Sequence, residues 1–343
     1  MNSKKINILI TGGCGFVGSN IALKLNSLNE FSITVIDNLS RDGSRENQKL
    51  LKKNNINFFN LDISNENQLN NFLSNSQFDF ILNFAGQVSM VKSIENPLND
   101  LSINLMGTIN LLEFIRNNSP KTKYLNISSN KVYGDLLWDK LKEDQTRYSS
   151  KTFTNGYDEK IPLKFSGPYG CSKGAAEQYT IDYSSIYNLN TSSIRLSTIF
   201  GPQQYATFDQ GWVGWFIKSY LEQKHEDELI FKVQGDGKQV RDILFVQDFA
   251  NLIVEIIFNF EKARGEVFNV GGGLNNSLSI IELINLLNAD QKKYKIINEG
   301  WRAADQKHYI SDMTKLFNIF EWRPEHELEE GLKTYFNWIE SSV

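Results

Sequence analysis

A tyrosine and a lysine four positions apart are the first residues of this 343-residue chain whose types and spacing suggest chemistry. On a helix, Tyr169 and Lys173 project from one face, about one turn from each other. A tyrosine hydroxyl has a pKa of about 10 in water, and a nearby ammonium favours the phenolate, which acts as a base near neutral pH. Such a pair is also common as a plain surface contact, so the prediction depends on a further partner.

A serine at the end of a short apolar run supplies that partner. Residues 124–127 predict a strand, and Ser129 follows shortly after it. In a doubly wound sheet the carboxyl ends of the strands line the ligand crevice, where the Ser129 hydroxyl can share a substrate proton with Tyr169. A role in a helix cap or turn is the alternative for this serine. We predict Ser129, Tyr169 and Lys173 as the catalytic residues.

A glycine-rich loop near the beginning of the chain indicates a dinucleotide site. The predicted strand 6–11 runs into Gly12-Gly13-Cys14-Gly15-Phe16-Val17-Gly18, ahead of a helix whose free N–H groups suit a pyrophosphate. Asp37 ends the second predicted strand, 19 residues after Gly18, where a carboxylate accepts both ribose hydroxyls and repels a 2′-phosphate. These features favour NAD over NADP, although Arg41 nearby moderates the repulsion.

The elements that must position these residues alternate along the first half of the chain. Runs rich in β-branched residues predict strands at 6–11, 32–37, 56–61, 78–84 and 124–127, and the predicted helices include 104–117 and 169–187. Apolar strands separated by helices are typical of a parallel sheet that is covered on both faces. The predicted fold class is therefore α/β, with a Rossmann-type doubly wound parallel sheet.

Beyond residue 198 the pattern becomes less regular and indicates a smaller lobe. An aromatic-rich segment spans 205–216, and a glycine break at 271–273 is followed by one predicted helix. We predict an NAD-binding domain at 1–197, to which 240–270 return. A partly interleaved C-terminal substrate lobe is predicted at 198–239 and 271–343.

Composition favours a small-molecule partner. The 36 basic and 40 acidic residues leave a net charge of -4, and no run of like charges forms a patch for nucleic acid or for a membrane. The apolar stretch 243–260 is interrupted by polar residues and predicts a core helix, and no leader is indicated before the first strand, so we expect a cytoplasmic protein. Two cysteines do not indicate disulfides, and three widely separated histidines form no metal motif, so we predict no metal site.

These residues resemble the extended short-chain dehydrogenase/reductases, and the resemblance spans essentially the whole chain. It is carried by Thr11 to Gly18, Asp37-Asn38-Leu39-Ser40, Asn83-Phe84-Ala85-Gly86, Ser129 and Tyr169-Gly170-Cys171-Ser172-Lys173. For the cofactor, the resemblance implies NAD bound by Gly12, Gly15, Phe16, Val17, Gly18, Asp37, Asn38, Ser40, Arg41, Asp62, Ile63, Phe84, Ala85, Gly86, Asn104, Tyr169 and Lys173. For a nucleotide-sugar substrate, it implies Gln87, Ser129, Asn130, Ser197, Arg241, Arg302 and Asp305.

Longer strings narrow the implied activity to C2 epimerisation of a CDP-linked sugar, from CDP-paratose to CDP-tyvelose. They are residues 130–135, 155–159, 168–176 and 205–216. In the implied reaction Tyr169 removes the C2 hydroxyl proton while hydride passes to NAD, Ser129 bonds the oxygen, and the 2-keto sugar turns before hydride returns. A homo-oligomer, dimer or tetramer, is implied as well.

Two departures from these strings bear on the sugar specificity. The triplet Ile127-Ser128-Ser129 has a serine where a threonine is expected, which keeps a hydroxyl. Leu196-Ser197-Thr198 stands where a His-Ser-Ser string is expected.

Three alternative activities compete with this one. A 4,6-dehydratase needs an acid near the leaving hydroxyl, and it is disfavoured because Ser129 is followed by Asn130 and Lys131, which are not carboxylic acids. A UDP-sugar 4-epimerase uses the same three catalytic residues and is the second prediction. A non-catalytic NAD-binding protein of the same fold is the third.

Two groups of residues have a purely structural alternative. Arg241 and Arg302 suit bidentate binding of phosphate, but ion pairs with Asp242 and Asp305 would explain them as well. The tryptophans at 212 and 215 are predicted to pack in the core of the lobe, so they are left out of the predicted site.

Overall fold

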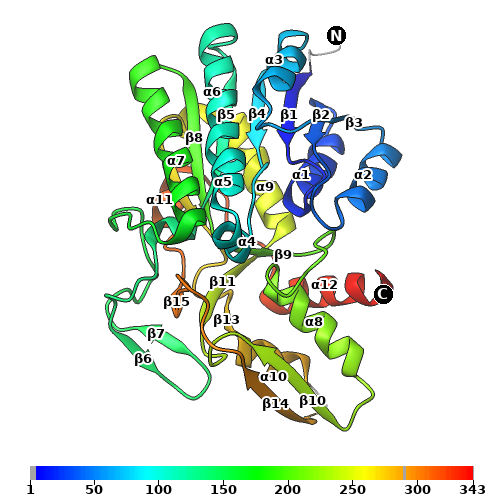
Figure 1. The fold of residues 1–343 in the computed structure, drawn as a ribbon, viewed down its shortest axis with the longest axis vertical. Helices are drawn as coiled ribbons and strands as arrows, with labels where there is room; N and C mark the ends of the chain where they lie inside the picture. Colours follow the sequence, from blue (N-terminus) through cyan, green and yellow to red (C-terminus); the bar gives the residue numbers. More distant parts are fainter. Residues whose placement is uncertain (1–4, 289–290, 343) are drawn as a thin grey trace.

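A seven-stranded parallel sheet organises the computed structural model, which describes residues 5–288 and 291–342 (Figure 1). The strand order is β12-β8-β5-β4-β1-β2-β3, so β1 has β2 on one side and β4 on the other. The strands are β1 (Ile6–Thr11), β2 (Phe31–Asp37), β3 (Asn57–Asn60), β4 (Phe80–Asn83), β5 (Lys123–Ser129), β8 (Asn190–Leu196) and β12 (Val267–Val270). The predicted α/β class and the Rossmann-type sheet are confirmed.

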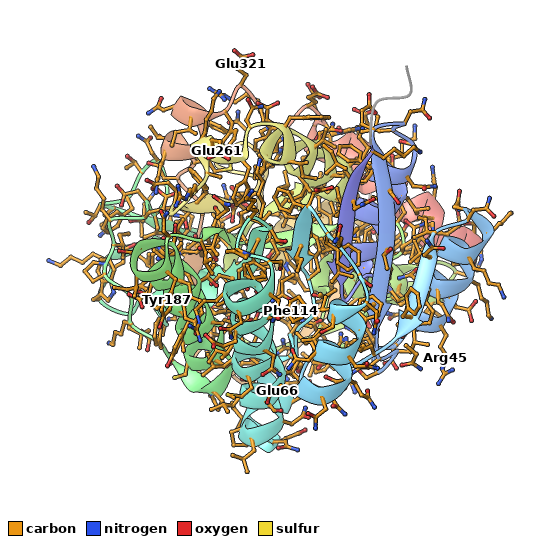
Figure 2. The ribbon with its side chains drawn as sticks, turned by 90° about the horizontal axis from the view of Figure 1, so that it is seen from above. Arg45, Glu66, Phe114, Tyr187, Glu261 and Glu321 are labelled. Carbon is orange, nitrogen blue, oxygen red and sulfur yellow. The ribbon has the colours of Figure 1, made fainter. Side chains whose placement is uncertain are left out.

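Helices cover both faces of this sheet, as its nearly continuous apolar strands require. In Figure 2 the helices coloured light blue to green lie on one side of the sheet and the yellow α9 on the other. One layer contains α3 (Glu66–Ser74), α6 (Gly107–Asn118) and α7 (Gly167–Tyr187), and its core includes Leu69, Leu111 and Tyr183. The other contains α1 (Phe16–Asn26), α2 (Ser44–Lys53) and α9 (Val246–Phe258), and its core includes Ile21 and Phe249.

Two predicted helices begin earlier than expected. The segment predicted as a helix at 104–117 opens with a π-helical turn, η1 (Ser102–Met106), and continues as α6. The second, α7, begins at Gly167 with Pro168 in its first turn, where the missing proline N–H would have no helical partner anyway. This start places Tyr169 and Lys173 in the first two turns of α7.

The remaining strands form a lobe below the carboxyl ends of the sheet (Figure 1). Short strands make a four-stranded sheet from β9 (Thr198–Phe200), β11 (Val240–Phe245), β13 (Ser277–Ser279) and β15 (His308–Tyr309). Two strand pairs accompany it: β10 (Glu228–Val233) with β14 (Lys293–Asn298), and β6 (Leu141–Glu143) with β7 (Tyr148–Ser150). The helices and turns not yet named are α4 (Met90–Glu95), α5 (Pro97–Leu101), η2 (Asn130–Tyr133), α8 (Trp212–Gln223), η3 (Phe260–Lys262), α10 (Ile280–Leu287), α11 (Thr314–Ile319) and α12 (Leu328–Ser342).

The C-terminal part differs from the sequence-based expectation. In the described part after the glycine break lie three helices, α10, α11 and α12, where one was predicted. Of the segment 240–270 assigned to the NAD-binding domain, α9 and β12 do lie on the large sheet, but β11 pairs with β9, β13 and β15. The division into two domains therefore stays a proposal, and residues 1–4, 289–290 and 343 of its ranges lie outside the described residues.

A buried ion pair joins β8 to α7, the helix that carries Tyr169 and Lys173. The Arg195 guanidinium donates from Nη2 to Glu177 at 2.6 Å and from Nε to both carboxylate oxygens at 3.1 Å. A third donor, Nη1, reaches the Tyr133 hydroxyl at 2.7 Å. Because Glu177 has no exposed surface, its charge depends on Arg195 for compensation.

Replacement of Arg195 by methionine is expected to lower the free energy of unfolding by about 3–5 kcal/mol, because a carboxylate is left buried without its cation. Urea unfolding of the cofactor-free protein measures this change. Adding Glu177→Gln in the same chain should recover part of the loss, whereas Lys49→Met, which removes an exposed pair with Glu46, should have little effect. Equal effects of the buried and the exposed substitutions would contradict the assignment.

Candidate active site

A cavity of about 660 Å³ lies between the carboxyl ends of the large sheet and the lobe. The sheet contributes residues that follow β1, β2, β4, β5 and β8, and the lobe contributes side chains from α8, β10, β11 and the segment before β15. Every predicted site residue except Asn104 lines this cavity. The strand order reverses here between β1 and β4, which is where open α/β sheets bind their ligands.

The glycine loop is packed too closely for side chains. Gly12 has a φ of +62°, and a Cβ there would stand 2.6 Å from the Cα of Ala85 in the loop after β4. A Cβ on Gly18 would stand 2.5 Å from the Gly12 carbonyl oxygen. The loop leads directly into α1. No side chain of the described residues caps the first N–H groups of that helix. Such a helix start suits a phosphate group.

Asp37 is fixed at the rim of the same cavity. Its Oδ1 accepts the Leu39 N–H at 2.7 Å, and its Oδ2 accepts the Cys14 N–H at 3.0 Å. Burial raises the pKa of Asp37, while the backbone hydrogen bonds from Leu39 and Cys14 act against this rise. The Arg41 guanidinium donates to the Gln210 side chain of the lobe at 2.8 Å. Among the described residues it forms no hydrogen bond with Asp37. An anchored carboxylate at the end of β2 is suited to accept ribose hydroxyls.

The cavity continues from Asp37 toward the predicted catalytic residues, as an extended dinucleotide would require. The lining also includes Asp62 and Ile63 after β3, and Phe84 and Gly86 after β4. A Cβ on Gly86 would meet the Asn104 Oδ1 at 3.0 Å and Lys173 Nζ at 3.8 Å, so a larger residue here would crowd the Asn104 amide. These residues fit NAD in kind.

Asn104 lies behind this wall and takes no part in the lining. Its Nδ2 donates to the Gln87 carbonyl oxygen at 3.0 Å, to Asp100 at 3.2 Å and to the Ser172 hydroxyl at 3.1 Å. Its Oδ1 is buried without a hydrogen-bond partner among the described residues. The structure therefore places Asn104 one layer away from a direct contact.

Ser129, Tyr169 and Lys173 come together where β5 ends beside the first turns of α7. All three side chains are buried and line the cavity. Burial raises the pKa of Tyr169 to about 12, and the hydrogen bond with Ser129 partly counteracts it. Burial lowers the pKa of Lys173 to about 8, although Asp100 raises it.

The expected activation of the tyrosine by the lysine is not formed in this state. The Lys173 ammonium donates to the Ile127 carbonyl oxygen, and it is not among the groups that shift the pKa of Tyr169. Ser129 lies near enough to Tyr169 to lower the pKa of its hydroxyl, so a substrate hydroxyl at this point would meet both oxygens. The three residues can carry out proton transfer to and from a substrate hydroxyl.

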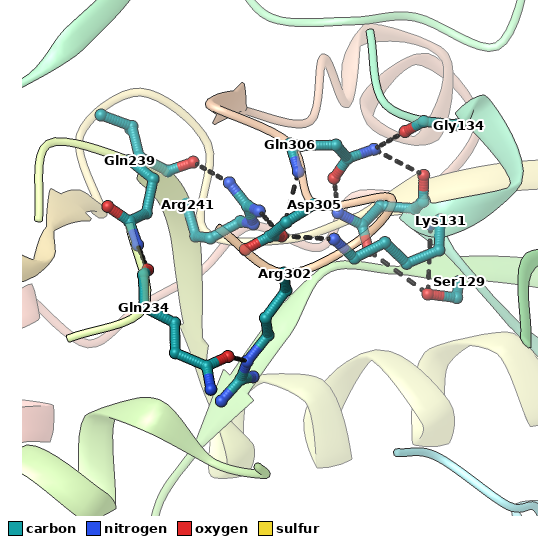
Figure 3. Close-up of polar contacts among 11 residues, drawn as sticks. Ser129, Lys131, Gly134, Gln234, Gln239, Arg241, Arg302, Asp305 and Gln306 are labelled. Atoms are coloured by element: carbon teal, nitrogen blue, oxygen red, sulfur yellow. Dashed lines mark hydrogen bonds and ion pairs between the residues drawn. The ribbon is translucent and has the colours of Figure 1, made fainter. Parts of the chain in front are cut away.

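Cationic side chains gather at the lobe end of the cavity (Figure 3). Asp305 Oδ1 accepts from Arg241 Nη2 at 2.7 Å, from Lys131 Nζ at 2.9 Å and from the Gln306 N–H at 2.9 Å. Burial acts to raise the pKa of Asp305, but Lys131 and Arg241 outweigh it and hold this pKa well below its usual range. Arg302 bonds the Gln234 side chain and donates to the Phe208 carbonyl oxygen at 2.8 Å. Two cations pair with this carboxylate and Arg302 lies near them, an arrangement that attracts a diphosphate.

The ion pairs considered from the sequence are only partly present. Arg241 pairs with Asp305 instead of Asp242, and Arg302 pairs with neither carboxylate among the described residues. Three other predicted substrate residues have side chains engaged within the protein: Gln87 with Asp100 at 2.8 Å, Asn130 with Gln306 at 3.0 Å, and Ser197 with Asp242.

Sequence reasoning missed several residues that line the cavity. The sequence analysis considered Lys131 only as a residue that is not the carboxylic acid of a dehydratase. Its partner Asp305 is 174 positions away, so sequence proximity could not indicate the pair. Trp212 and Trp215 pack against the lobe core as predicted, and they also line the cavity, which the sequence did not indicate. The dense aromatic string 205–216 was the available signal. Phe208 belongs to it and lies edge-on to Trp215, with ring centroids 5.4 Å apart.

The fold and the site together define a Rossmann-type protein with a serine, a tyrosine and a lysine at its ligand crevice. Residues 9–335 match the family model described as GDP-mannose 4,6 dehydratase. The chain belongs to this family, one of nucleotide-sugar epimerases and dehydratases among the extended short-chain dehydrogenase/reductases.

Individual relatives cover nearly the whole chain. It is 42% identical to the CDP-paratose 2-epimerase of Salmonella typhi over 341 residues, which is 98% of this chain and 100% of the relative. The structure of Pal from Bacillus thuringiensis superposes with a TM-score of 0.84 at 26% identity, covering 98% of this chain and 100% of Pal. The UDP-glucose 4-epimerase of Thermus thermophilus in complex with NAD gives a TM-score of 0.80 at 26% identity, covering 98% and 100%.

Neither a membrane span nor a metal cluster is found in residues 5–288 and 291–342. None of the helices there combines the length and the apolar content that a membrane crossing demands. No group of three or more histidine, cysteine, aspartate or glutamate side chains in those ranges is arranged to hold a metal ion.

Replacement of Lys173 by methionine is expected to raise the free energy of unfolding at neutral pH by up to about 3 kcal/mol, because the folded chain no longer contains a buried ammonium. The folded protein releases this proton at a pKa of about 8, whereas the unfolded chain keeps it up to the ordinary value of 10.5. The destabilisation by the lysine is thus full below pH 8 and fades as the pH rises toward 10.5, and the advantage of the variant should fade with it.

Urea unfolding of cofactor-free protein at about pH 7 and about pH 9.5 measures both effects. Lys53→Met, at an exposed position on α2, is the control and should change stability little at either pH. A Lys173→Met protein that is no more stable than the parent at neutral pH would show that the buried ammonium is fully compensated.

Proposed function

We propose that this protein is an NAD-dependent epimerase that inverts C2 of a CDP-linked sugar, converting CDP-paratose to CDP-tyvelose. The observation that carries the substrate is the 42% identity to the CDP-paratose 2-epimerase of Salmonella typhi over the full length of that enzyme. The chemistry is supported by Ser129, Tyr169 and Lys173, which are buried together in the lining of a cavity that fits a dinucleotide.

Each residue of the site has a definite task in this reaction. Bound NAD supplies the acceptor and then the donor of the hydride at C2. Tyr169 takes the proton of the C2 hydroxyl and returns it, and Ser129 bonds the same oxygen, so that the neutral 2-keto sugar is formed and then reduced on its other face. Burial of both side chains excludes water from this proton transfer. The cation cluster retains the diphosphate while the ring turns.

A UDP-sugar 4-epimerase is the second candidate. The similarity to the NAD complex of a UDP-glucose 4-epimerase supports it, because the same fold and the same three catalytic residues would serve at C4. A dehydratase is disfavoured, since Asn130 and Lys131 stand beside Ser129 and both bond to the segment 305–306 of the lobe.

The deciding experiment is to incubate the purified protein with CDP-paratose, and separately with UDP-glucose, in the presence of NAD and without external reductant. Proton NMR of the sugar ring should show CDP-paratose converting to CDP-tyvelose and UDP-glucose unchanged. Conversion of UDP-glucose alone would replace the proposal by its alternative.

Tyr169→Phe should reduce this turnover by about 10²–10⁴-fold, because the proton transfer loses its base, while NAD affinity stays close to that of the parent. Tyr179→Phe, on the exposed side of the same helix, is the matched control and should leave turnover unchanged. NMR follows turnover, and a fluorescence titration follows NAD. Undiminished epimerisation by the Tyr169 variant would refute the assigned base.

We also propose that the protein is a homo-oligomer located in the cytoplasm. Support for association comes from apolar side chains that stay exposed on neighbouring elements, namely Leu98 and Leu101 on α5, Met106 on η1 and Ile186 on α7. Sedimentation of the purified protein would distinguish a monomer from a dimer or tetramer.

A further inference from the structure

Three cations line the lobe end of the cavity, namely Lys131, Arg241 and Arg302. Of these three, Lys131 alone belongs to the loop that follows β5, the strand that ends at Ser129. Its N–H donates to the Ser129 hydroxyl oxygen at 3.2 Å, while its Nζ extends to Asp305 at 2.9 Å. In Figure 3 the side chain runs from the loop beside Ser129 to the Asp305 carboxylate, where its Nζ ends, and only 14% of it is exposed. Arg241 and Arg302, by contrast, belong to the lobe.

The covalent structure of a nucleotide sugar makes this position informative. The diphosphate is joined through oxygen to C1 of the sugar, and C2 is bonded directly to C1, whereas C4 lies across the ring. A reaction at C2 therefore brings the sugar-side phosphate close to the reacting hydroxyl, and so close to Ser129 and Tyr169. A charged phosphate in a buried site needs a cation beside it. This cation must keep a fixed position relative to the Ser129 hydroxyl.

We propose that the Lys131 ammonium binds the sugar-side phosphate of the substrate and thereby presents C2, and not C4, to Ser129 and Tyr169. The inference rests on the proposed function, because the argument starts from a reaction at C2. Since Lys131 holds the phosphate and not the ring, the 2-keto sugar can turn about the bonds that join it to the phosphate.

The hydrogen bonds in this cluster leave capacity for such a ligand. An ammonium has three donors, and Asp305 is the one acceptor of Lys131 Nζ among the described residues. Asp305 fixes the position of the ammonium, and it neutralises only one of the three positive charges of Lys131, Arg241 and Arg302. The remaining two match the two charges of a nucleoside diphosphate ester.

The test compares CDP, which has the sugar-side phosphate, with CMP, which lacks it, by isothermal titration of the NAD-loaded protein. Lys131→Met should weaken CDP binding by about tenfold to a hundredfold, the effect of losing one charge-assisted hydrogen bond, and should leave CMP binding within about twofold. Lys131→Arg keeps the cation and should retain most of the CDP affinity. Lys131→Gln keeps a hydrogen-bond donor for Asp305 and should behave like methionine, which covers the case of a poorly folding methionine variant.

Lys238→Met is the matched control, because Lys238 also forms an ion pair at 2.8 Å, with Glu143, but does not line the cavity. It should change neither affinity. Equal weakening of CDP and CMP in the Lys131 variants would mean that Lys131 only supports the lobe through Asp305, and would overturn the proposal, as would unchanged CDP affinity. No preference of the parent protein for a diphosphate over its monophosphate would overturn it too.

The ratio of the affinity for UDP to that for UMP, measured in the same way, separates this proposal from the proposed function. If the protein binds uridine but not cytidine nucleotides, the substrate assignment fails, and the effect of Lys131→Met on the UDP to UMP ratio still decides the role of Lys131.

Discussion

The close approach of the loops after β1 and β4 is the constraint on which the site depends. Gly12 has no room for a Cβ because Ala85 lies against it, and the Thr11 hydroxyl bonds Asn83 at 2.6 Å directly beneath. This contact fixes the point at which the strand order reverses, and the crevice opens above it. Asp37 and Ser129, at the ends of strands on opposite sides of this point, thereby face one cavity.

A second set of contacts holds the lobe against the catalytic strand. Asn130 bonds Gln306, Lys131 pairs with Asp305, and the Gln306 amide reaches the Gly134 carbonyl oxygen at 2.7 Å. The loop that carries Ser129 and the segment that carries Asp305 and Gln306 are therefore held together. In the proposed reaction, this coupling would keep one carbon of a sugar that is anchored by its nucleotide beside Ser129.

Much of the nucleotide-binding half could be predicted from the sequence, because its information is local. The β-branched runs and the glycine loop predicted correctly that residues 6–11 form a strand and that Asp37 ends the next one. The lobe could not be predicted in the same way, since β9, β13 and β15 are two or three residues long and give no periodicity. Lys131 was missed for a related reason, because its role depends on a partner that only the fold brings near.

The electrostatics of the catalytic residues show why a buried site needs charged ligands. Burial opposes the charged form of both side chains, so the pKa of Tyr169 rises to about 12 while that of Lys173 falls to about 8. Positive charge or hydrogen bonds stabilise a phenolate at this point, and the Lys173 ammonium donates to the Ile127 carbonyl oxygen instead of to Tyr169. Proton transfer by Tyr169 is therefore favoured by any ligand that brings positive charge or a hydrogen-bond donor beside its hydroxyl.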